Sequence, residues 1–343
     1  MAQRKRTDQL RLHIPALKKF SLLRKLIGIF FVISFFAEAS SAQVRWKKVD
    51  SLYGNLPPSV HVYKTTDSLS GIPFVAYYVS AALKDKKLQF TAQLSNGNPY
   101  TPDQYYLLEN SPLVVVNAGF FSFENGQSLS TVIRNGKIVS ESVAALRGIN
   151  EDSNIYYYPT RSAIGIGRKR RADVAWIFTN LPHHRPYAFE NAPVIARGKD
   201  PAPNIYQLSD IDWKWWEMRT AVGGGPCLVH DGKIWVTNKQ EQMFVGEENK
   251  KQPRTAMGYT KDGRLIILVI QGRDPGKAEG ATLDEEANLM KNLDCYEALN
   301  LAGGGSSCML VNGKETIKPS EDSGQRPVPS AFLIKWSNDQ KPK

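Results

Sequence analysis

Four Asn-Gly or Asp-Gly dipeptides divide this chain of 343 residues into paired segments. Each lies between two apolar or β-branched runs: Asn135-Gly136, Asp231-Gly232, Asp262-Gly263 and Asn312-Gly313. A type I′ turn needs a positive φ at both central residues, which Asn or Asp followed by Gly adopts readily. The sequence therefore predicts a β-hairpin at each position and a fold rich in antiparallel strands.

Further runs rich in β-branched and aromatic residues continue this pattern. They cover residues 59–64, 74–80, 87–93, 113–117, 131–140, 154–158, 162–167, 174–178 and 192–196. Residues 282–293 instead carry apolar side chains at helical spacing, and Thr282 with Glu285 forms a capping-box pattern at their start. We predict an α+β fold, mainly antiparallel or mixed β-sheet with a few helices, in a single domain.

The positive charge of the chain is concentrated at its N-terminus. Residues 1–42 hold eight Lys or Arg against Asp8 and Glu38, a net +6, so the rest carries 11 − 6 = +5. Because the remaining charges are interspersed, we expect no nucleic-acid partner. An apolar run at 26–36 follows the basic residues and is shorter than the ~20 residues that span a bilayer. Residues 1–42 are therefore predicted to be a signal peptide or an N-terminal anchor, and the protein to be exported to the periplasm or the extracellular space.

The rest of the chain has no low-complexity linker. We divide it into a β-rich N-terminal part, residues 43–110, and a main part, residues 111–337. Residues 181–218 interrupt the strand pattern with prolines, histidines and aromatic residues and are predicted to be a long excursion. The three cysteines, Cys227, Cys295 and Cys308, allow one disulfide at most, and we favour three buried thiols.

A glycine triplet, Gly303 to Gly305, follows an apolar run and precedes Ser306 and Ser307. Such a turn exposes backbone N–H groups to an approaching anion, although it also suits a plain tight connection. Arg254 and Arg273 each stand beside a hydrophobic strand, and a guanidinium group pairs well with phosphate oxygens. These residues are candidates for an anion site.

The order of these motifs resembles that of the phosphodiester glycosidases. It comprises RTAMG at 254–258, a strand that ends in Gln271-Gly-Arg273, GATLDEEANLM at 280–290 and NLAGGGSSCM at 300–309. Upstream, Asn117-Ala-Gly-Phe-Phe121 and Gly223-Gly-Gly-Pro226 resemble two further elements of the family. The resemblance covers roughly residues 110–335, and it implies that the main part is a phosphodiester glycosidase-like domain.

The resemblance implies an exported hydrolase that releases a sugar, for example N-acetylglucosamine, from a phosphodiester. The substrate is then a carbohydrate or sugar phosphate, and a membrane contact arises only through the N-terminal segment if that segment is not cleaved. His183, His184 and His230 show no metal-ligand spacing, so no metal is expected, and no cofactor is expected either. The implied catalytic residues are Glu285, Arg254 and Arg273. The implied substrate-binding residues are Asn117, Arg219, Gln271, Gly303, Gly304, Gly305, Ser306 and Ser307. Two of these also have ordinary explanations, since Glu285 can serve as a helix cap and Asn117 can cap its own turn.

Two positions depart from the family pattern. Relatives usually have Asp where this chain has Ala302, and commonly Asp where it has Gln271. A methyl group accepts no proton, and an amide is a poor base. The alternative function is therefore a catalytically impaired sugar-phosphate or glycan-binding protein on the same fold.

Overall fold

The computed structural model describes residues 44–95, 97–179, 185–208, 212–244 and 246–337. The predicted signal peptide or anchor, residues 1–42, lies outside the described residues, as does part of the excursion at 181–218. From Val44 onward the chain forms one compact unit. Within the described ranges, no helix has both the length and the apolar character needed to span a bilayer.

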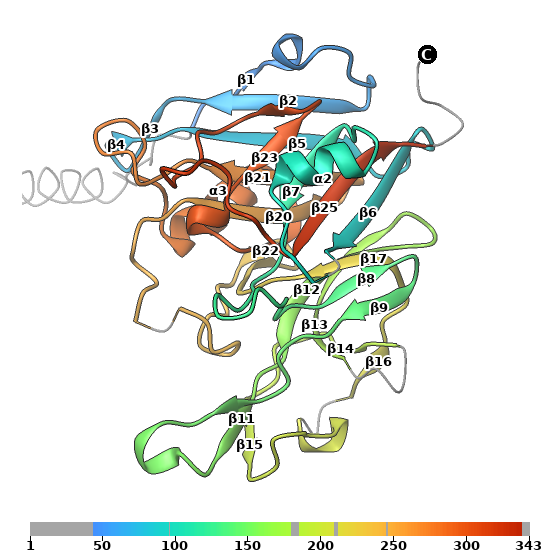
Figure 1. The fold of residues 1–343 in the computed structure, drawn as a ribbon, viewed down its shortest axis with the longest axis vertical. Coiled ribbons are helices and arrows are strands. Elements are labelled where there is room, and N and C mark those ends of the chain that lie inside the picture. The colour runs from blue at the N-terminus through green and yellow to red at the C-terminus, as the bar shows by residue number, and fades with distance from the viewer. Residues whose placement is uncertain (1–43, 96, 180–184, 209–211, 245, 338–343) are drawn as a thin grey trace, which may run out of the picture. The chain divides into compact units, whose positions relative to one another are not determined.

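Three large antiparallel sheets make up most of this unit (Figure 1). The eight-stranded sheet has the order β1 (Lys47–Lys48), β2 (Val60–Thr65), β5 (Ala76–Ala82), β21 (Arg264–Ile270), β20 (Arg254–Thr260), β22 (Cys295–Asn300), β18 (Cys227–His230), β19 (Lys233–Ile234). The seven-stranded sheet has the order β16 (Lys214–Trp215), β14 (Tyr187–Phe189), β13 (Ala172–Phe178), β12 (Arg161–Gly167), β17 (Met218–Gly223), β8 (Val132–Arg134), β9 (Lys137–Ser140). The five-stranded sheet has the order β24 (Lys314–Glu315), β23 (Met309–Val311), β7 (Val114–Asn117), β25 (Ser330–Trp336), β6 (Leu88–Leu94).

The remaining elements are short. Two small sheets are formed by β10 (Leu146–Arg147), β11 (Tyr156–Tyr158) and β15 (Ala196–Gly198), and by β3 (Ser68–Leu69) and β4 (Ile72–Pro73). The described residues contain two α-helices, α2 (Pro102–Leu108) and α3 (Leu283–Asn292). Single 3₁₀ turns are η1 (Asp50–Tyr53), η2 (Asn150–Asp152), η4 (Ile205–Gln207) and η5 (Gly304–Ser306).

One hydrophobic core is shared by the three large sheets. Val79 and Ile267 reach it from the eight-stranded sheet, Ile164 from the seven-stranded sheet, and Val116 and Phe332 from the five-stranded sheet. The N-terminal part of the chain contributes β5 to the interior of the eight-stranded sheet, where it pairs with β21, and β6 to the edge of the five-stranded sheet, where it pairs with β25. A second cluster lies on the other face of the eight-stranded sheet, where α3 packs its apolar side chains.

The structure confirms the predicted hairpin turns. Asn135, Asp231 and Asn312 have φ values of 53°, 50° and 46°, and the glycine after each also has a positive φ. At Asp262-Gly263, which joins β20 to β21, only the glycine has a positive φ. Every strand pairing among the described residues is antiparallel, so the fold agrees broadly with the predicted α+β class. The predicted strand at 192–196 is wrong, since β15 begins only at Ala196 and pairs with β11.

A buried carboxyl group joins two of the sheets. Glu241 is fully buried and accepts hydrogen bonds from Ser162 N on β12, Trp176 Nε1 on β13 and Cys227 N on β18, at 2.8–2.9 Å. Burial raises the pKa of Glu241, and these hydrogen bonds oppose that rise. The three cysteines are all buried free thiols, which excludes a disulfide between any two of them in this structure.

Candidate anion-binding site

A pocket of about 390 Å³ gathers motifs that are far apart in the sequence. It brings Arg254 and Arg273 to the same place as the glycine triplet. Four cationic side chains and one carboxylate stand among the described residues that line it. The full lining is Phe120, Phe121, Phe123, Phe244, Glu247, Lys250, Gln252, Arg254, Arg273, Ala302, Gly303, Gly304, Gly305, Ser306 and Arg326. Such a charge balance favours an anionic ligand.

Arg254 is held rigidly at the start of β20. Its side chain is almost wholly buried, and its Nε and Nη2 donate hydrogen bonds of 3.0 Å to the backbone oxygens of Ala281 and Lys250. Its guanidinium group lies over the ring of Phe244, 5.7 Å from the centroid. Two backbone anchors and an aromatic contact fix the direction of the group, which reduces the entropy lost when an anion binds.

The glycine triplet makes room for arginine side chains. Gly304 has a φ of +62°, and a Cβ there would lie 3.0 Å from Nη2 of Arg273. A Cβ on Gly305 would collide with the Arg326 and Glu321 side chains. Gly304 N donates 2.8 Å to Pro253 O, so this N–H group is already used inside the protein. The triplet therefore leaves space for the guanidinium groups of Arg273 and Arg326, a role that the sequence did not indicate.

Asn117 supports this turn from behind. It is fully buried at the end of β7, and its Nδ2 donates 2.6 Å to Ala302 O. Its Oδ1 accepts hydrogen bonds from Thr255 Oγ1 and Cys308 N. Ser307 is also buried there, 3.2 Å from Thr255 Oγ1. Asn117 and Ser307 were predicted to bind substrate, but the structure places both beneath the turn and outside the pocket lining.

Two lining residues have unusual backbone conformations. Arg273 and Phe244 have φ values of 59° and 50°, in the left-handed region that side chains of this size seldom occupy. Arg273 Nε donates 2.9 Å to Gln252 Oε1, which helps to hold the exposed arginine at the pocket. Strained backbone is concentrated at functional sites, so both observations support a function for this pocket.

Arg326, Lys250 and the aromatic wall were not predicted. Arg326 lies over the ring of Phe123, 5.1 Å from the centroid, and pairs with Glu321. Lys250 forms a 2.7 Å ion pair with Glu247, the carboxylate of the lining. The sequence did carry a signal for Arg326, because this residue lies shortly before the last buried strand, β25. A sequence gives no comparable signal for Lys250, which lies in an irregular segment.

Three predicted site residues lie elsewhere. Glu285 caps α3 through the Thr282 backbone N–H and pairs with Lys251 at 2.7 Å, so its capping role is the one observed. Arg219 is exposed on β17 and lines two other surface pockets. Gln271 bonds to Asp274 Oδ2 and to the backbone N of Lys318. None of the three lines the pocket.

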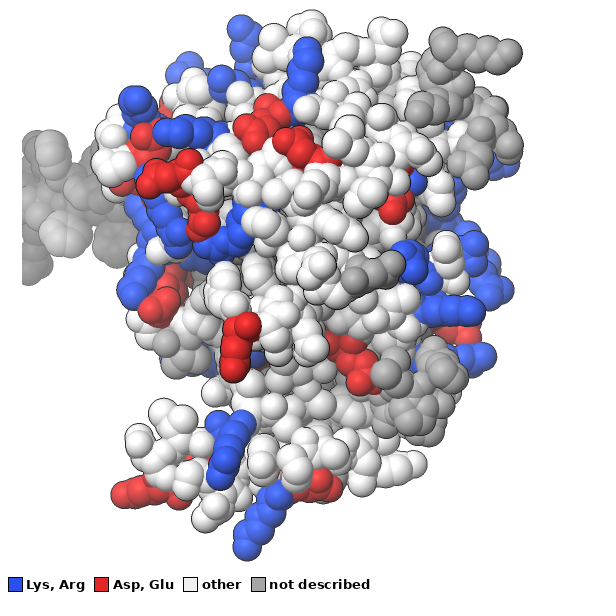
Figure 2. Space-filling model, viewed as in Figure 1, with Lys and Arg blue, Asp and Glu red and all other residues white. Residues whose placement is uncertain are grey.

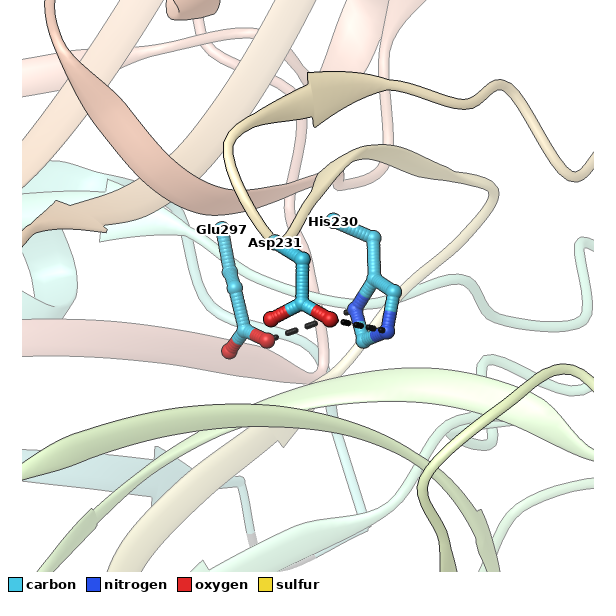
Figure 3. Close-up of side chains that lie close together, drawn as sticks. All are labelled: His230, Asp231 and Glu297. Carbon is cyan, nitrogen blue, oxygen red and sulfur yellow. Dashed lines mark ion pairs between the residues drawn. The ribbon is translucent and has the colours of Figure 1, made fainter.

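A separate polar group surrounds His230 on β18 (Figure 3). Its Nδ1 lies 3.3 Å from Glu297 Oε1, and its Nε2 lies 3.8 Å from Asp231 Oδ2. The two ring nitrogens thus face different carboxylates, which suits an imidazolium ion better than a chelated metal ion. Contact with Glu297 raises the pKa of His230, and partial burial opposes the rise.

On the face shown in Figure 2, basic and acidic side chains are interspersed and form no continuous basic surface.

The structure is β-rich and has a pocket lined mainly by cationic and aromatic side chains, and comparison with known proteins relates part of the chain to a family. A model of the phosphodiester glycosidase family matches residues 183–335. The chain is 26% identical over 217 residues to the N-acetylglucosamine-1-phosphodiester alpha-N-acetylglucosaminidase of Bos taurus. Residues 183–335 thus match the phosphodiester glycosidase family, as the motifs predicted. The bovine match covers 61% of this chain and 33% of the relative, so this chain spans about a third of that protein.

Two solved structures share the fold. The zebrafish N-acetylglucosamine-1-phosphodiester alpha-N-acetylglucosaminidase catalytic domain, auto-inhibited by its pro-peptide, superposes with a TM-score of 0.54 and 18% identity. That match covers 85% of this chain and 88% of the zebrafish chain. A hypothetical protein from Synechocystis gives a TM-score of 0.58 at 16% identity, and covers 86% of this chain and 64% of the other.

Proposed function

We propose that this protein is an exported glycosidase that hydrolyses a sugar–phosphodiester bond in a glycoconjugate, for example an N-acetylglucosamine 1-phosphodiester. The observation that carries this proposal is the pocket in which Arg254, Arg273 and Arg326 surround a glycine turn. The family and its glycosidase relatives support the reaction type. Export rests on the basic and apolar order of residues 1–42.

The arrangement fits the chemistry of the reaction. Breaking the bond between the anomeric carbon and the phosphate oxygen leaves a negatively charged phosphate monoester. Guanidinium groups fixed around that oxygen stabilise the developing charge without reorganising. The phenyl rings of Phe120, Phe121 and Phe244 offer an apolar wall for the sugar ring. Glu247 in the lining and Glu321 beside Arg326 are the carboxylates placed to accept the proton of the attacking water.

A second candidate is a sugar-phosphate or glycan-binding protein on the same fold. Ala302 favours it, because its methyl group lines the pocket where the resemblance implies a carboxylate. Glu247 favours it too, since this carboxylate is already paired with Lys250. Such a protein would keep the anion pocket and lack turnover.

The two functions are separated by measuring sugar release and binding in the same preparation. Mature protein is incubated with 1-phosphodiesters of N-acetylglucosamine, glucose and galactose, and free sugar is quantified. The enzyme releases sugar from at least one of them, and Arg254→Ala abolishes the release. Binding of a sugar 1-phosphate without release from any diester would establish the binding protein instead.

A further inference from the structure

Glu286 occupies the middle of the apolar stripe of α3. Leu283, Ala287 and Met290 share this stripe at helical spacing, and all four side chains are fully buried. Neither carboxyl oxygen of Glu286 has a hydrogen-bond partner among the described residues. An ionised carboxylate in such a place loses its hydration without compensation. A carboxyl group in this place is stabilised either by a neighbouring positive charge or by protonation.

The neighbouring charge is the guanidinium group of Arg254, which lies on β20 beneath the helix. Its Nε donates 3.0 Å to the backbone oxygen of Ala281, directly before the α3 cap Thr282, and its positive charge opposes the rise in the pKa of Glu286 that burial causes. The influence is mutual, since Glu286 also acts on the buried Arg254. Arg254 is at the same time part of the pocket lining. Glu286 is therefore coupled electrostatically to the pocket through Arg254, although it does not line the pocket.

The other titratable groups on the elements packed against α3 are neutral, paired or exposed. Burial raises the pKa of the thiols of Cys227 on β18 and Cys295 on β22, and the pKa of Tyr259 and Tyr296 is raised as well. His230 on β18 and Glu297 on β22 contact each other. On α3, Glu285 pairs with Lys251, while Asp284 and Lys291 are exposed, as is Lys233 on β19.

Two opposing effects set the protonation of Glu286. Burial raises its pKa to about 8, and the positive charge of Arg254 opposes this rise. A negative charge bound beside Arg254 offsets the field of the guanidinium group. That charge also repels an ionised carboxylate, so it raises the pKa of Glu286 further.

We propose that Glu286 is a positioning residue that couples anion binding in the Arg254 pocket to the uptake of a proton. When the phosphate group of a ligand binds, a proton from the solvent adds to the Glu286 carboxylate. The positive charge of Arg254 then interacts with the ligand and no longer with an ionised Glu286. Because linkage is reciprocal, the same proton strengthens anion binding. The inference depends on the proposed function only in that an anion binds this pocket; turnover is not required.

The test uses sulfate as the probe, because its charge stays constant in the range used. Its Kd is measured by calorimetry at about pH 7 and about pH 9.5 for wild type, Glu286→Gln and Asp284→Asn. Asp284 is exposed on the same helix, so Asp284→Asn is the matched control for loss of one acidic charge. We expect the wild-type Kd to rise about tenfold with pH, that of Glu286→Gln less than about twofold, and that of Asp284→Asn as in wild type.

Calorimetry in two buffers of different ionisation enthalpy supplies the second readout. Wild type takes up protons on binding sulfate at about pH 8.5, and Glu286→Gln takes up almost none. A merely structural role of Glu286 would change stability without changing this proton count. Equal pH dependence in wild type and Glu286→Gln, or no sulfate binding by either, overturns the proposal. Sulfate binding with the expected proton uptake but no hydrolysis of any sugar phosphodiester would instead refute only the proposed enzymatic function.

Folding of the variant is checked in the same series. Glu286→Gln and Glu286→Met both remove the ionisable group, and Met suits the apolar stripe. Should Glu286→Gln unfold, the folded Glu286→Met protein serves the same comparison. Retention of the full wild-type pH dependence by that variant would refute the coupling.

Discussion

Asn117 Nδ2 donates a hydrogen bond of 2.6 Å to the backbone oxygen of Ala302, which lies 185 residues later in the chain. This bond ties the end of β7 to the turn that forms the pocket. In a fully buried place, Asn117→Ala removes the side-chain partner of Ala302 O and Cys308 N and one of the two partners of Thr255 Oγ1. We expect a loss of about 3 kcal/mol in the free energy of unfolding, measured by urea titration.

The exposed Asn288 on α3 provides the control for Asn117. Asn288→Ala removes only a local hydrogen bond to Asp284 O and is expected to change stability by less than about 0.5 kcal/mol. Equal effects of the two substitutions would show that Asn117 does not hold the turn in place.

Ala302→Asp places a carboxylate in the pocket lining, where the resemblance implies one. We expect kcat for sugar release to rise at least about tenfold, because a positioned base accelerates attack by water. Phosphate binding should weaken, since the added charge repels the anion. The control is Ala302→Asn, which has the same shape and no charge, and a rise in kcat equal to that of the Asp variant would argue against a base at this position.

Arg273 combines backbone strain with its position at the pocket. Arg273→Gly relieves the left-handed conformation and should raise the free energy of unfolding by up to about 1 kcal/mol while weakening sulfate binding. Arg273→Lys keeps the strain and a positive charge but loses the planar guanidinium group. A glycine variant that is no more stable than the lysine variant would show that the conformation carries no strain.

The His230–Glu297 contact makes stability depend on pH. Because contact with Glu297 raises the pKa of folded His230, its contribution is complete below the pKa of the unfolded state and is lost as pH rises through the folded value. His230→Asn should therefore cost about 3 kcal/mol near pH 5.5 and progressively less at higher pH, measured by denaturant titration at several pH values. A cost that stays constant from pH 5.5 to about pH 9 would exclude a charged His230.

Short sequence motifs predicted the fold well where a few neighbouring residues determine the backbone geometry. Asn135-Gly136 and Asn312-Gly313 have positive φ values in their hairpin turns, and Thr282 with Glu285 caps α3 as expected. The strand predicted at residues 192–196 does not form there, because an apolar and β-branched run becomes a strand only when a partner strand lies beside it. β15 pairs with β11 from Ala196 onward and not before.

The site was only partly predictable from the sequence, because it depends on the direction in which the side chains at each strand end point. Arg254, Arg273 and the glycine triplet meet, as the order of motifs implied. Arg219 stands in a similar RTAxG motif but is exposed at the opposite end of β17 from Gly223. The rotation of α3 buries Glu286, although it stands in an acidic run with Asp284 and Glu285 that is typical of an exposed helix face.

The most direct test of the account is a crystal structure with N-acetylglucosamine 1-phosphate bound. We predict that its phosphate lies between the guanidinium groups of Arg254, Arg273 and Arg326, and that its sugar ring lies against Phe120 and Phe244. A phosphate bound elsewhere on the protein, with this pocket free of ligand at saturating concentration, would contradict the central claim.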